Sequence, residues 1–319
     1  MLKFISKKIA LQWILLVGLF AFAIFTIIEK AHVANADGAT FLFKAFAHFF
    51  QQHEYAGKGV IITVLLLQIM LLQYFFGKNE FVAKATLLPA CFYISILLIT
   101  KSLSTISPLF FTLMFFLMIL SINYAVSPVK LKNNAFIVGI ISAFATCFDV
   151  SGLIFIILAI ITLIINHYSK IKEILILLSG FILVYIYAFS YYFLVNKLDI
   201  WLLSYKEIKI SSMFNGEISI SALSQISLMC LCIIYLYFMI RTRLISATKT
   251  VIVRKQALSL NIWSVLMGAS LLLSYTTYPY ILGYLSVPIV IYLTILVPEK
   301  NRGYINEWVT LITFITLCL

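Results

Sequence analysis

EILILLSGFILVYIYAFSYYFLV, residues 173–195, is an apolar run whose single charged residue, Glu173, stands at its start. A membrane-spanning helix needs about 20 consecutive apolar residues, because each residue advances about 1.5 Å and the hydrocarbon core is about 30 Å thick. The run lacks the strict alternation of polar and apolar residues that indicates a half-buried strand. It therefore predicts a transmembrane helix and sets the class of the protein.

Similar apolar runs flank this one along the whole chain. The expected spans are 10–28, 59–77, 86–100, 108–126, 134–148, 151–166, 173–195, 221–240, 261–276, 279–297 and 307–319. Hydrophobic residues make up 63% of the 319 residues, against about 45–50% in a soluble domain. We predict an all-α fold, a polytopic transmembrane bundle of about 11 spans in a single integral membrane domain, 1–319. The short third run, 86–100, and fifth run, 134–148, are expected to be tilted, re-entrant or sheltered by neighbouring helices.

Basic residues fall preferentially on alternate loops, which gives the bundle an orientation. With the N-terminus in the cytoplasm, 16 of the 23 lysines and arginines lie on the inner side, as the positive-inside rule predicts. We expect a multi-pass protein of the bacterial inner (cytoplasmic) membrane, with its C-terminus outside. Two outer loops, 29–58 and 196–220, are expected to cap the bundle. Residues 241–260 are expected to form a basic cytoplasmic loop beside anionic lipid headgroups.

Composition and missing motifs exclude several classes of function. The net charge of +12 is spread over loop ends and forms no basic stripe, so no nucleic-acid partner is expected. The chain has no G-x-x-x-x-G-K-[ST] motif and no zinc-binding histidine spacing, so we expect no cofactor and no metal. Charge within the spans is scarce, which disfavours a proton-coupled carrier or an ion channel.

Asp149 is the most pointed candidate for chemistry. It lies between the runs 134–148 and 151–166, which almost no loop separates. An ionisable group at membrane depth is costly unless it is paired or hydrated. One interpretation is that Asp149 or Ser151 caps the following helix. The other is a functional carboxylate near the outer surface that acts as a base or as a cation ligand.

The first outer loop carries two more acidic candidates, Glu29 and Asp37, which complete the predicted catalytic set with Asp149. The phenylalanines between residues 41 and 50 follow the pattern of an amphipathic helix lying in the membrane interface. An acidic residue in such a loop is well placed to act on a lipid-linked substrate.

Aromatic and amide side chains near the span ends supply further expectations. The tyrosines assigned to a substrate or lipid groove are Tyr187, Tyr191, Tyr278 and Tyr280. An interfacial belt is the alternative, because amphipathic rings also favour headgroup level. The tryptophans expected to anchor the interface are Trp13, Trp201, Trp263 and Trp308. Gln68 and Gln73 are expected to bond a neighbouring helix, and Pro288 is expected to kink its span.

The apolar spacing of the whole chain resembles an uncharacterised bacteroidete family of multi-spanning inner-membrane proteins, a domain of unknown function. The matching stretches are 110–120, Ala145-Thr146-Cys147-Phe148, the run Gly152 to Leu158, and Leu285-Ser286-Val287-Pro288-Ile289 before Pro298-Glu299. This family implies a membrane bundle and supplies no catalytic residues.

A weaker likeness is to C-class glycosyltransferases and polysaccharide polymerases, which also place an outer loop with juxtamembrane helices after the first span. That likeness implies binding of a polyprenyl-linked sugar. Glu29 and Asp37 are separated by seven residues here, where that superfamily commonly has an adjacent acidic pair.

Three functional hypotheses follow from these patterns. The first is a protein of cell-envelope biogenesis whose outer groove engages a polyprenyl- or lipid-linked substrate. In one version of this hypothesis the protein is a glycosyltransferase-like enzyme with Asp37 or Asp149 as its base. The second is a non-catalytic subunit or scaffold of a membrane protein complex, and the third is a transporter. The expected partners are membrane lipids, a lipid-linked sugar and other membrane protein subunits.

Overall fold

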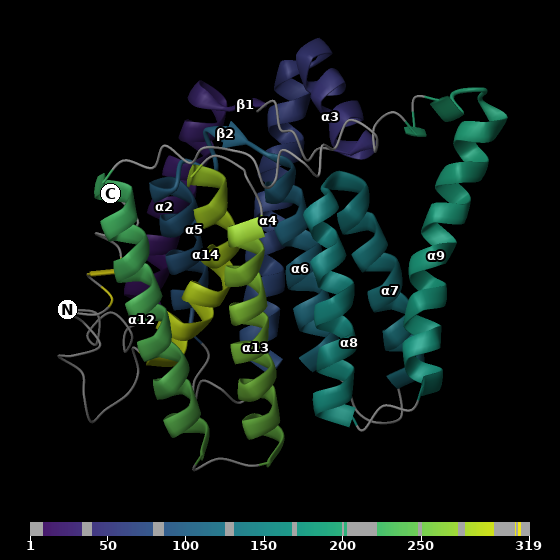
Figure 1. Ribbon diagram of the computed structural model, residues 1–319. Coiled ribbons are helices and arrows are strands. Elements are labelled where there is room, and N and C mark those ends of the chain that lie inside the picture. Colours follow the sequence, from purple (N-terminus) through teal and green to yellow (C-terminus); the bar gives the residue numbers. More distant parts are fainter. Residues whose placement is uncertain are drawn as a thin grey trace.

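The computed structural model describes residues 9–33, 40–78, 86–124, 131–167, 171–199, 201–202, 222–247, 251–273, 278–296, 310 and 312–313. Within these ranges the fold is all-α, with eleven α-helices, a 3₁₀ turn and two short strands (Figure 1). The helices are α2 (Ile9–Lys30), α3 (Phe41–Gln52), α4 (Glu54–Lys78), α5 (Leu88–Ile99), α6 (Pro108–Tyr124), α7 (Leu131–Phe148), α8 (Leu153–His167), α9 (Ile171–Leu194), α12 (Ala222–Ala247), α13 (Val251–Leu273) and α14 (Tyr278–Leu296). The 3₁₀ turn is η2 (Val150–Gly152), and the strands are β1 (His32–Val33) and β2 (Thr105–Ile106).

Three of the described helices are long and apolar enough to cross a membrane by length and composition, namely α2, most of α4 (Glu54–Gly77) and α9. Shorter apolar helices of 10–17 residues accompany them. The bounds of α2 and α9 lie within two residues of the predicted runs 10–28 and 173–195. The architecture supports a membrane protein with several apolar helices, whereas the number of spans and their sidedness stay predictions.

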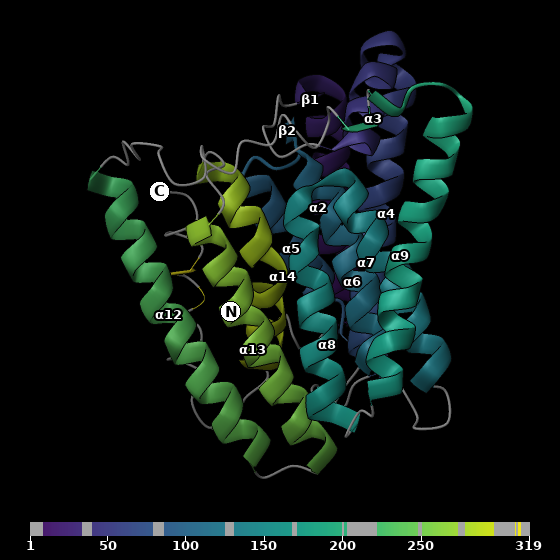
Figure 2. The same cartoon turned by 45° about the vertical axis from the view of Figure 1, so that its right-hand side comes forward.

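One end of the bundle, called the α3 end below, gathers α3, the β1–β2 pair and the junction of α7 with η2 (Figure 1). Lys58, near the start of α4, bonds the carbonyl of Ile28, near the end of α2. The two strands pair in parallel, and Thr40 bonds the carbonyl of Phe148. α12 ends and α13 begins at the opposite end of the bundle (Figure 2). The α3 end therefore joins segments that the predicted threading assigns to one side of the membrane.

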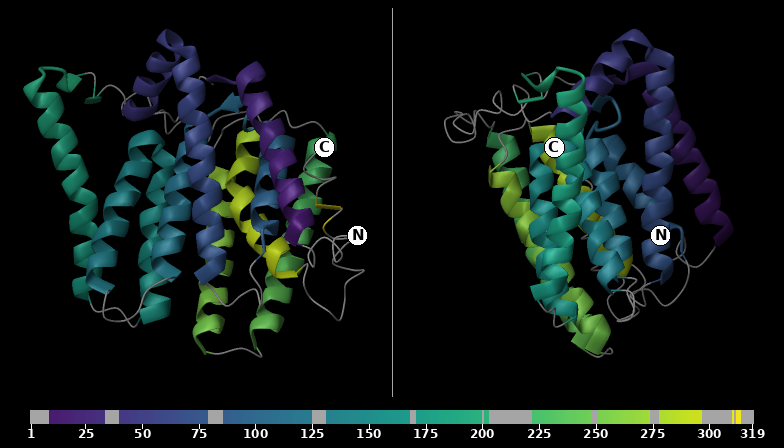
Figure 3. Two further views of the ribbon diagram at one scale, coloured as in Figure 1. Left: turned by 180° about the vertical axis from the view of Figure 1, so that it is seen from behind. Right: turned by 90° about the vertical axis from the view of Figure 1, so that its right-hand side faces the viewer.

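The short helix α5 is sheltered by its neighbours, one of the alternatives expected for the third run. Its 12 residues are about 18 Å long, well below the thickness of the hydrocarbon core. Nine of them are buried. The side-chain oxygen of Gln12 in α2 accepts from the N–H of Leu87 (2.8 Å) and from the Thr86 hydroxyl (3.2 Å), which satisfies polar groups at the start of α5. α2 and α4 lie on the face of the molecule that is turned away in Figure 1 (Figure 3).

Two residues of the predicted spans show how the interior is built. The amide nitrogen of Gln68 donates to the carbonyl of Phe110 (2.6 Å), and its oxygen accepts from the Tyr93 hydroxyl (3.0 Å), which confirms its predicted bond to a neighbouring helix. Trp263, by contrast, is only 1% exposed and its ring centroid lies 5.0 Å from that of Phe116. The expectation that it anchors the interface is wrong, because α13 begins at residue 251 and Trp263 lies near its middle.

Residues 241–260 differ from the basic loop that the sequence predicts. Those up to Ala247 belong to α12, and those from Val251 belong to α13. Lysine and arginine are good helix formers, so a basic segment continues a helix readily once one face is buried. Thr242 and Ser246, one helical turn apart, supply that face in α12, with 2% and 6% of their surfaces exposed.

Candidate functional site

The structure brings two of the three predicted acidic residues to the α3 end. Glu29 is exposed in the last turn of α2, and Asp149 is half-buried directly after α7. Asp37 lies outside the described residues. The candidate site is therefore built around Asp149 and the segments that surround it.

Thr40, directly before α3, closes the C-terminal end of α7. Its N–H donates to the carbonyl of Phe148 (3.2 Å), and its hydroxyl donates to the carbonyl of Thr146 (3.2 Å). The N–H of Asp149 bonds the carbonyl of Ala145 at 3.0 Å. The last carbonyls of a helix have no partner within it, so Thr40 satisfies two groups that would otherwise be left open. The contact spans 106 residues of sequence, which hides it from local pattern analysis.

Gly152 lets the chain turn sharply just after the C-terminal end of α7. Its N–H donates to the carbonyl of Asp149 at 3.0 Å. A Cβ atom at this position would lie 2.7 Å from the carbonyl carbon of Ala145 and 2.7 Å from the nitrogen of Thr146. Only glycine fits this approach without a shift of the backbone, so Asp149 is held at a fixed place between two helices.

Phenylalanine rings attach α3 to the ends of α6 and α7. The ring centroids of Phe46 and Phe111 are 4.7 Å apart, and those of Phe111 and Phe148 are 5.0 Å apart with nearly parallel planes. Phe43 is 2% exposed and also contacts Phe111. Helix α3 thus buries its apolar face against protein, whereas the sequence pattern predicts a helix with that face in the lipid interface. It covers the bundle end at which Asp149 lies.

The predicted groove tyrosines of α9 and their neighbours have different surroundings. Tyr187 and Tyr191 are 69% and 62% exposed, so neither lines the interior of the described chain. Tyr185 instead bonds the Thr146 hydroxyl at 2.7 Å, and the Tyr192 ring meets that of Phe41 edge to face. The side chains of Tyr278 and Tyr280 lie outside the described part, although their backbone begins α14. A lipid groove at these tyrosines stays a prediction.

Lys58 is a buried cation at the α3 end. It is 8% exposed, and its ammonium donates to the carbonyl of Ile28 at 2.7 Å and to the carboxylate of Glu54 at 2.5 Å. The side chain of Glu54 is 59% exposed, so the ion pair itself contributes little. The bond to the carbonyl near the end of α2 contributes most of the stabilisation by Lys58, because it brings a positive charge to the negative pole of the helix dipole.

Replacing Lys58 with methionine is expected to lower the free energy of unfolding by about 2 kcal/mol, since a charge-assisted hydrogen bond is lost. Lys197→Met is the matched control, because Lys197 is exposed after α9. Thermal unfolding in one detergent measures both variants. Equal melting temperatures for the two would contradict a structural role for Lys58.

A second polar cluster lies in the middle of the bundle, away from the predicted site. The indole N–H of Trp263 donates to the hydroxyl of Thr162 in α8. The Tyr292 hydroxyl donates to the side-chain oxygen of Asn261 at 2.8 Å and lies 2.7 Å from the Ser264 hydroxyl. These bonds tie α8, α13 and α14 together, so the cluster holds helices in register.

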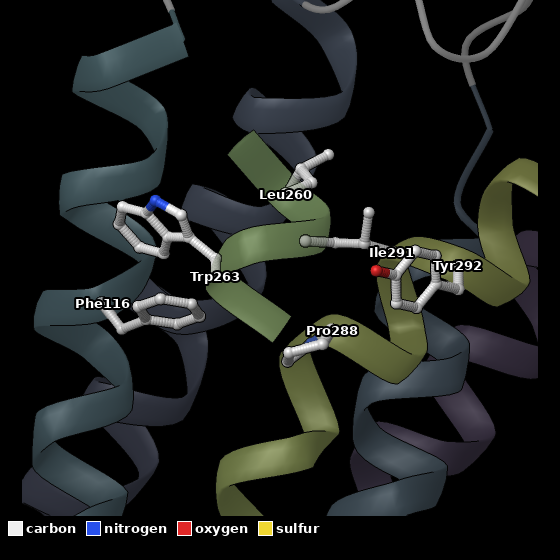
Figure 4. Close-up of a pocket in the computed structure, with 6 residues that line it drawn as sticks. All are labelled: Phe116, Leu260, Trp263, Pro288, Ile291 and Tyr292. Carbon is white, nitrogen blue, oxygen red and sulfur yellow. The ribbon is translucent and has the colours of Figure 1, made fainter. Parts of the chain in front are cut away.

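An apolar cavity adjoins this cluster (Figure 4). The residues that line it are Phe116, Leu260, Trp263, Pro288, Ile291 and Tyr292. Its volume is about 10 Å³, about the space of one water molecule. The walls are almost wholly apolar, and a water needs several polar partners. The cavity therefore suits neither water nor a sugar, and the mid-bundle cluster is a packing feature. The sequence gives only a weak signal for it, an asparagine and a serine within an apolar run.

No group of three or more histidine, cysteine, aspartate or glutamate residues within the described ranges is arranged to hold a metal ion. Comparison with protein-family models, curated proteins and solved structures finds no match to this chain. The bacteroidete family and the glycosyltransferase likeness therefore stay predictions.

Proposed function

We propose that this chain is an integral inner-membrane protein of bacterial cell-envelope biogenesis that engages a polyprenyl- or lipid-linked substrate at its α3 end. The observation that carries the proposal is the position of Asp149. It is a half-buried acidic residue at one end of an apolar bundle, and it directly follows Phe148, whose carbonyl accepts from the N–H of Thr40 and whose ring stacks on Phe111. An amphiphilic substrate can present its polar group at this end of the bundle while its hydrocarbon chain stays in the lipid.

The chemistry that fits such a residue is a glycosyl transfer. The Asp149 carboxylate takes the proton of an acceptor hydroxyl, the acceptor oxygen forms the new bond to the sugar, and the polyprenyl phosphate leaves with the bonding electrons. Glu29 and Asp37 are the other candidates for the base. Glu29 is exposed on the neighbouring end of α2, so it reaches bulk water more readily than Asp149 does.

We expect Asp149→Asn to slow conversion of the lipid-linked substrate by about 100-fold or more, because an amide cannot accept the proton. The protein is purified from native membranes in nanodiscs, its bound lipids are identified by mass spectrometry, and their conversion is followed over time. Asp199→Asn is the matched control, since Asp199 is exposed beyond the end of α9. Equal rates for the two variants would remove Asp149 from the mechanism, and Glu29→Gln and Asp37→Asn would be measured next.

A second candidate function is a non-catalytic subunit of a membrane complex. Helix α9 supports it, because only 11% of an 18-residue apolar stretch within this helix is buried against the rest of the chain. Ile171 and Leu194 at its two ends are 76% and 79% exposed. A stoichiometric protein partner that co-purifies from native membranes, with no lipid-linked sugar bound, would favour this function over the first.

A further inference from the structure

Helix α9 is divided below into an inner half, which lies away from the α3 end, and an outer half, which lies toward it. The backbone of the inner half approaches that of α7 unusually closely. A Cβ atom on Gly139 would lie 2.1 Å from the carbonyl oxygen of Leu177, and one on Gly180 would lie 2.4 Å from that of Phe136. Small residues permit such approaches between membrane helices. This part of α9 therefore packs directly against the backbone of α7.

The outer half of α9 is attached differently, through side chains. The Thr146 hydroxyl donates to the carbonyl of Ala143 at 2.7 Å, so its 2.7 Å contact with Tyr185 is a bond that the tyrosine donates. Seven residues further along α9, the ring of Tyr192 meets that of Phe41 at 5.5 Å. Helix α9 diverges from α7 toward the α3 end in the views of the ribbon (Figures 1 and 3).

The attachment of α9 continues into α3. The carbonyl of Thr146 accepts from the hydroxyl of Thr40, the residue that precedes α3. The ring of Phe41, the first residue of α3, contacts the Tyr192 ring edge to face. Thr146 thus accepts two hydrogen bonds, one at its hydroxyl from Tyr185 of α9 and one at its carbonyl from Thr40, the residue before α3.

We infer that α9 is a lateral gate. It pivots where Gly139 and Gly180 meet the opposing backbone, and the Tyr185–Thr146 bond is the latch that closes its outer half. Opening releases the Tyr192 ring from Phe41 and admits a lipid hydrocarbon chain between α9 and α7, toward the α3 end. This inference goes beyond the proposed function and does not require that the protein be an enzyme.

Cys147 gives the gate a built-in reporter. It directly follows Thr146, whose hydroxyl accepts the bond from Tyr185, and it is 1% exposed. Cys91 is the matched internal control, since it is 2% exposed and packs beside Gln12 of α2, in another part of the bundle. Two single-cysteine proteins, one for each position, are reconstituted in nanodiscs, and the rate of their modification by N-ethylmaleimide is measured.

Tyr185→Phe is expected to raise the modification rate of Cys147 about fivefold, the factor by which losing one hydrogen bond shifts an opening equilibrium. Ser190→Ala is the matched control and leaves the rate unchanged, because Ser190 is exposed in the same half of α9 and its hydroxyl donates to the carbonyl of Ile186 in its own helix. Thr146→Val breaks the same bond, so combining it with Tyr185→Phe adds nothing further. The rate at Cys91 stays constant throughout.

Two results would overturn the gate. One is a Cys147 rate in Tyr185→Phe no higher than in Ser190→Ala, which means that the Tyr185–Thr146 bond does not close α9 against α7. The other is a parallel rise at Cys91, which means that the substitution loosens the whole bundle and opens no local gate. A negative result for the gate does not affect the proposed role of Asp149, because conversion of a bound lipid is measured in a separate experiment.

Discussion

Gly139→Ala is expected to destabilise the protein by about 3 kcal/mol, although alanine is the better helix former. In an unobstructed helix the change stabilises by about 0.5–1 kcal/mol, because glycine loses more backbone entropy on folding. At Gly139 the new methyl group would lie 2.1 Å from the carbonyl oxygen of Leu177, a distance well below the sum of the two van der Waals radii. Overpacking of this kind costs about 1–3 kcal/mol even where side chains can adjust, and here a backbone must move.

The chain contains its own control for this prediction. Gly18 in α2 has no atom from the other described segments of the chain within 4 Å of the position that a Cβ would occupy. Gly18→Ala should therefore leave the melting temperature unchanged or raise it, while Gly139→Ala and Gly180→Ala lower it. The sign of the difference is the test, measured by thermal unfolding in the same detergent. If Gly139→Ala melts with or above Gly18→Ala, the close approach of α7 and α9 is absent from the protein in solution.

Long apolar runs made most of the helices predictable. In lipid every backbone N–H and carbonyl must be satisfied within the segment, so a run such as 173–195 is restricted to a helix, and α9 follows it closely. Helix ends that lie outside the apolar runs were harder to predict from the sequence. α4 begins at Glu54 and α13 at Val251, five and ten residues before the predicted spans, because polar residues with good helix propensity extend both helices.

The candidate site was predictable only in part. The position of Asp149 between two apolar runs locates it at a bundle end, because two helices joined so tightly must reverse there. The partners around it come from distant segments. Thr40 reaches α7 across 106 residues, and the glycine contacts of α7 with α9 depend on a crossing geometry that periodicity alone does not specify.

Trp263 shows how an error in a helix boundary becomes an error about a residue. A tryptophan near the end of an apolar run is typical of the membrane interface. The run 261–276 places Trp263 at such an end, whereas α13 starts at residue 251 and carries the indole into the core. The two locations predict opposite consequences of truncation.

Trp263→Ala is expected to lower the free energy of unfolding by about 3–5 kcal/mol, the range for removing a large aromatic side chain from a core. The indole packs on Phe116 at 5.0 Å, and Phe116 in turn packs on Phe155 at 5.4 Å, so the truncation opens a cavity among three helices. Trp13→Ala is the control, because Trp13 in α2 is 54% exposed and its loss should change stability by less than about 0.5 kcal/mol.

Two milder substitutions separate the packing of Trp263 from its hydrogen bond. Thr162→Val leaves the indole N–H buried without an acceptor and should cost about 1–3 kcal/mol, whereas Trp263→Phe removes donor and indole together. The Thr162 hydroxyl keeps its bond to the carbonyl of Leu158 at 2.8 Å in Trp263→Phe, so no new unsatisfied group appears there. If Trp263→Ala melts like Trp13→Ala, the indole lies at the membrane surface after all, and the joint between α8 and α13 must be rebuilt around other contacts.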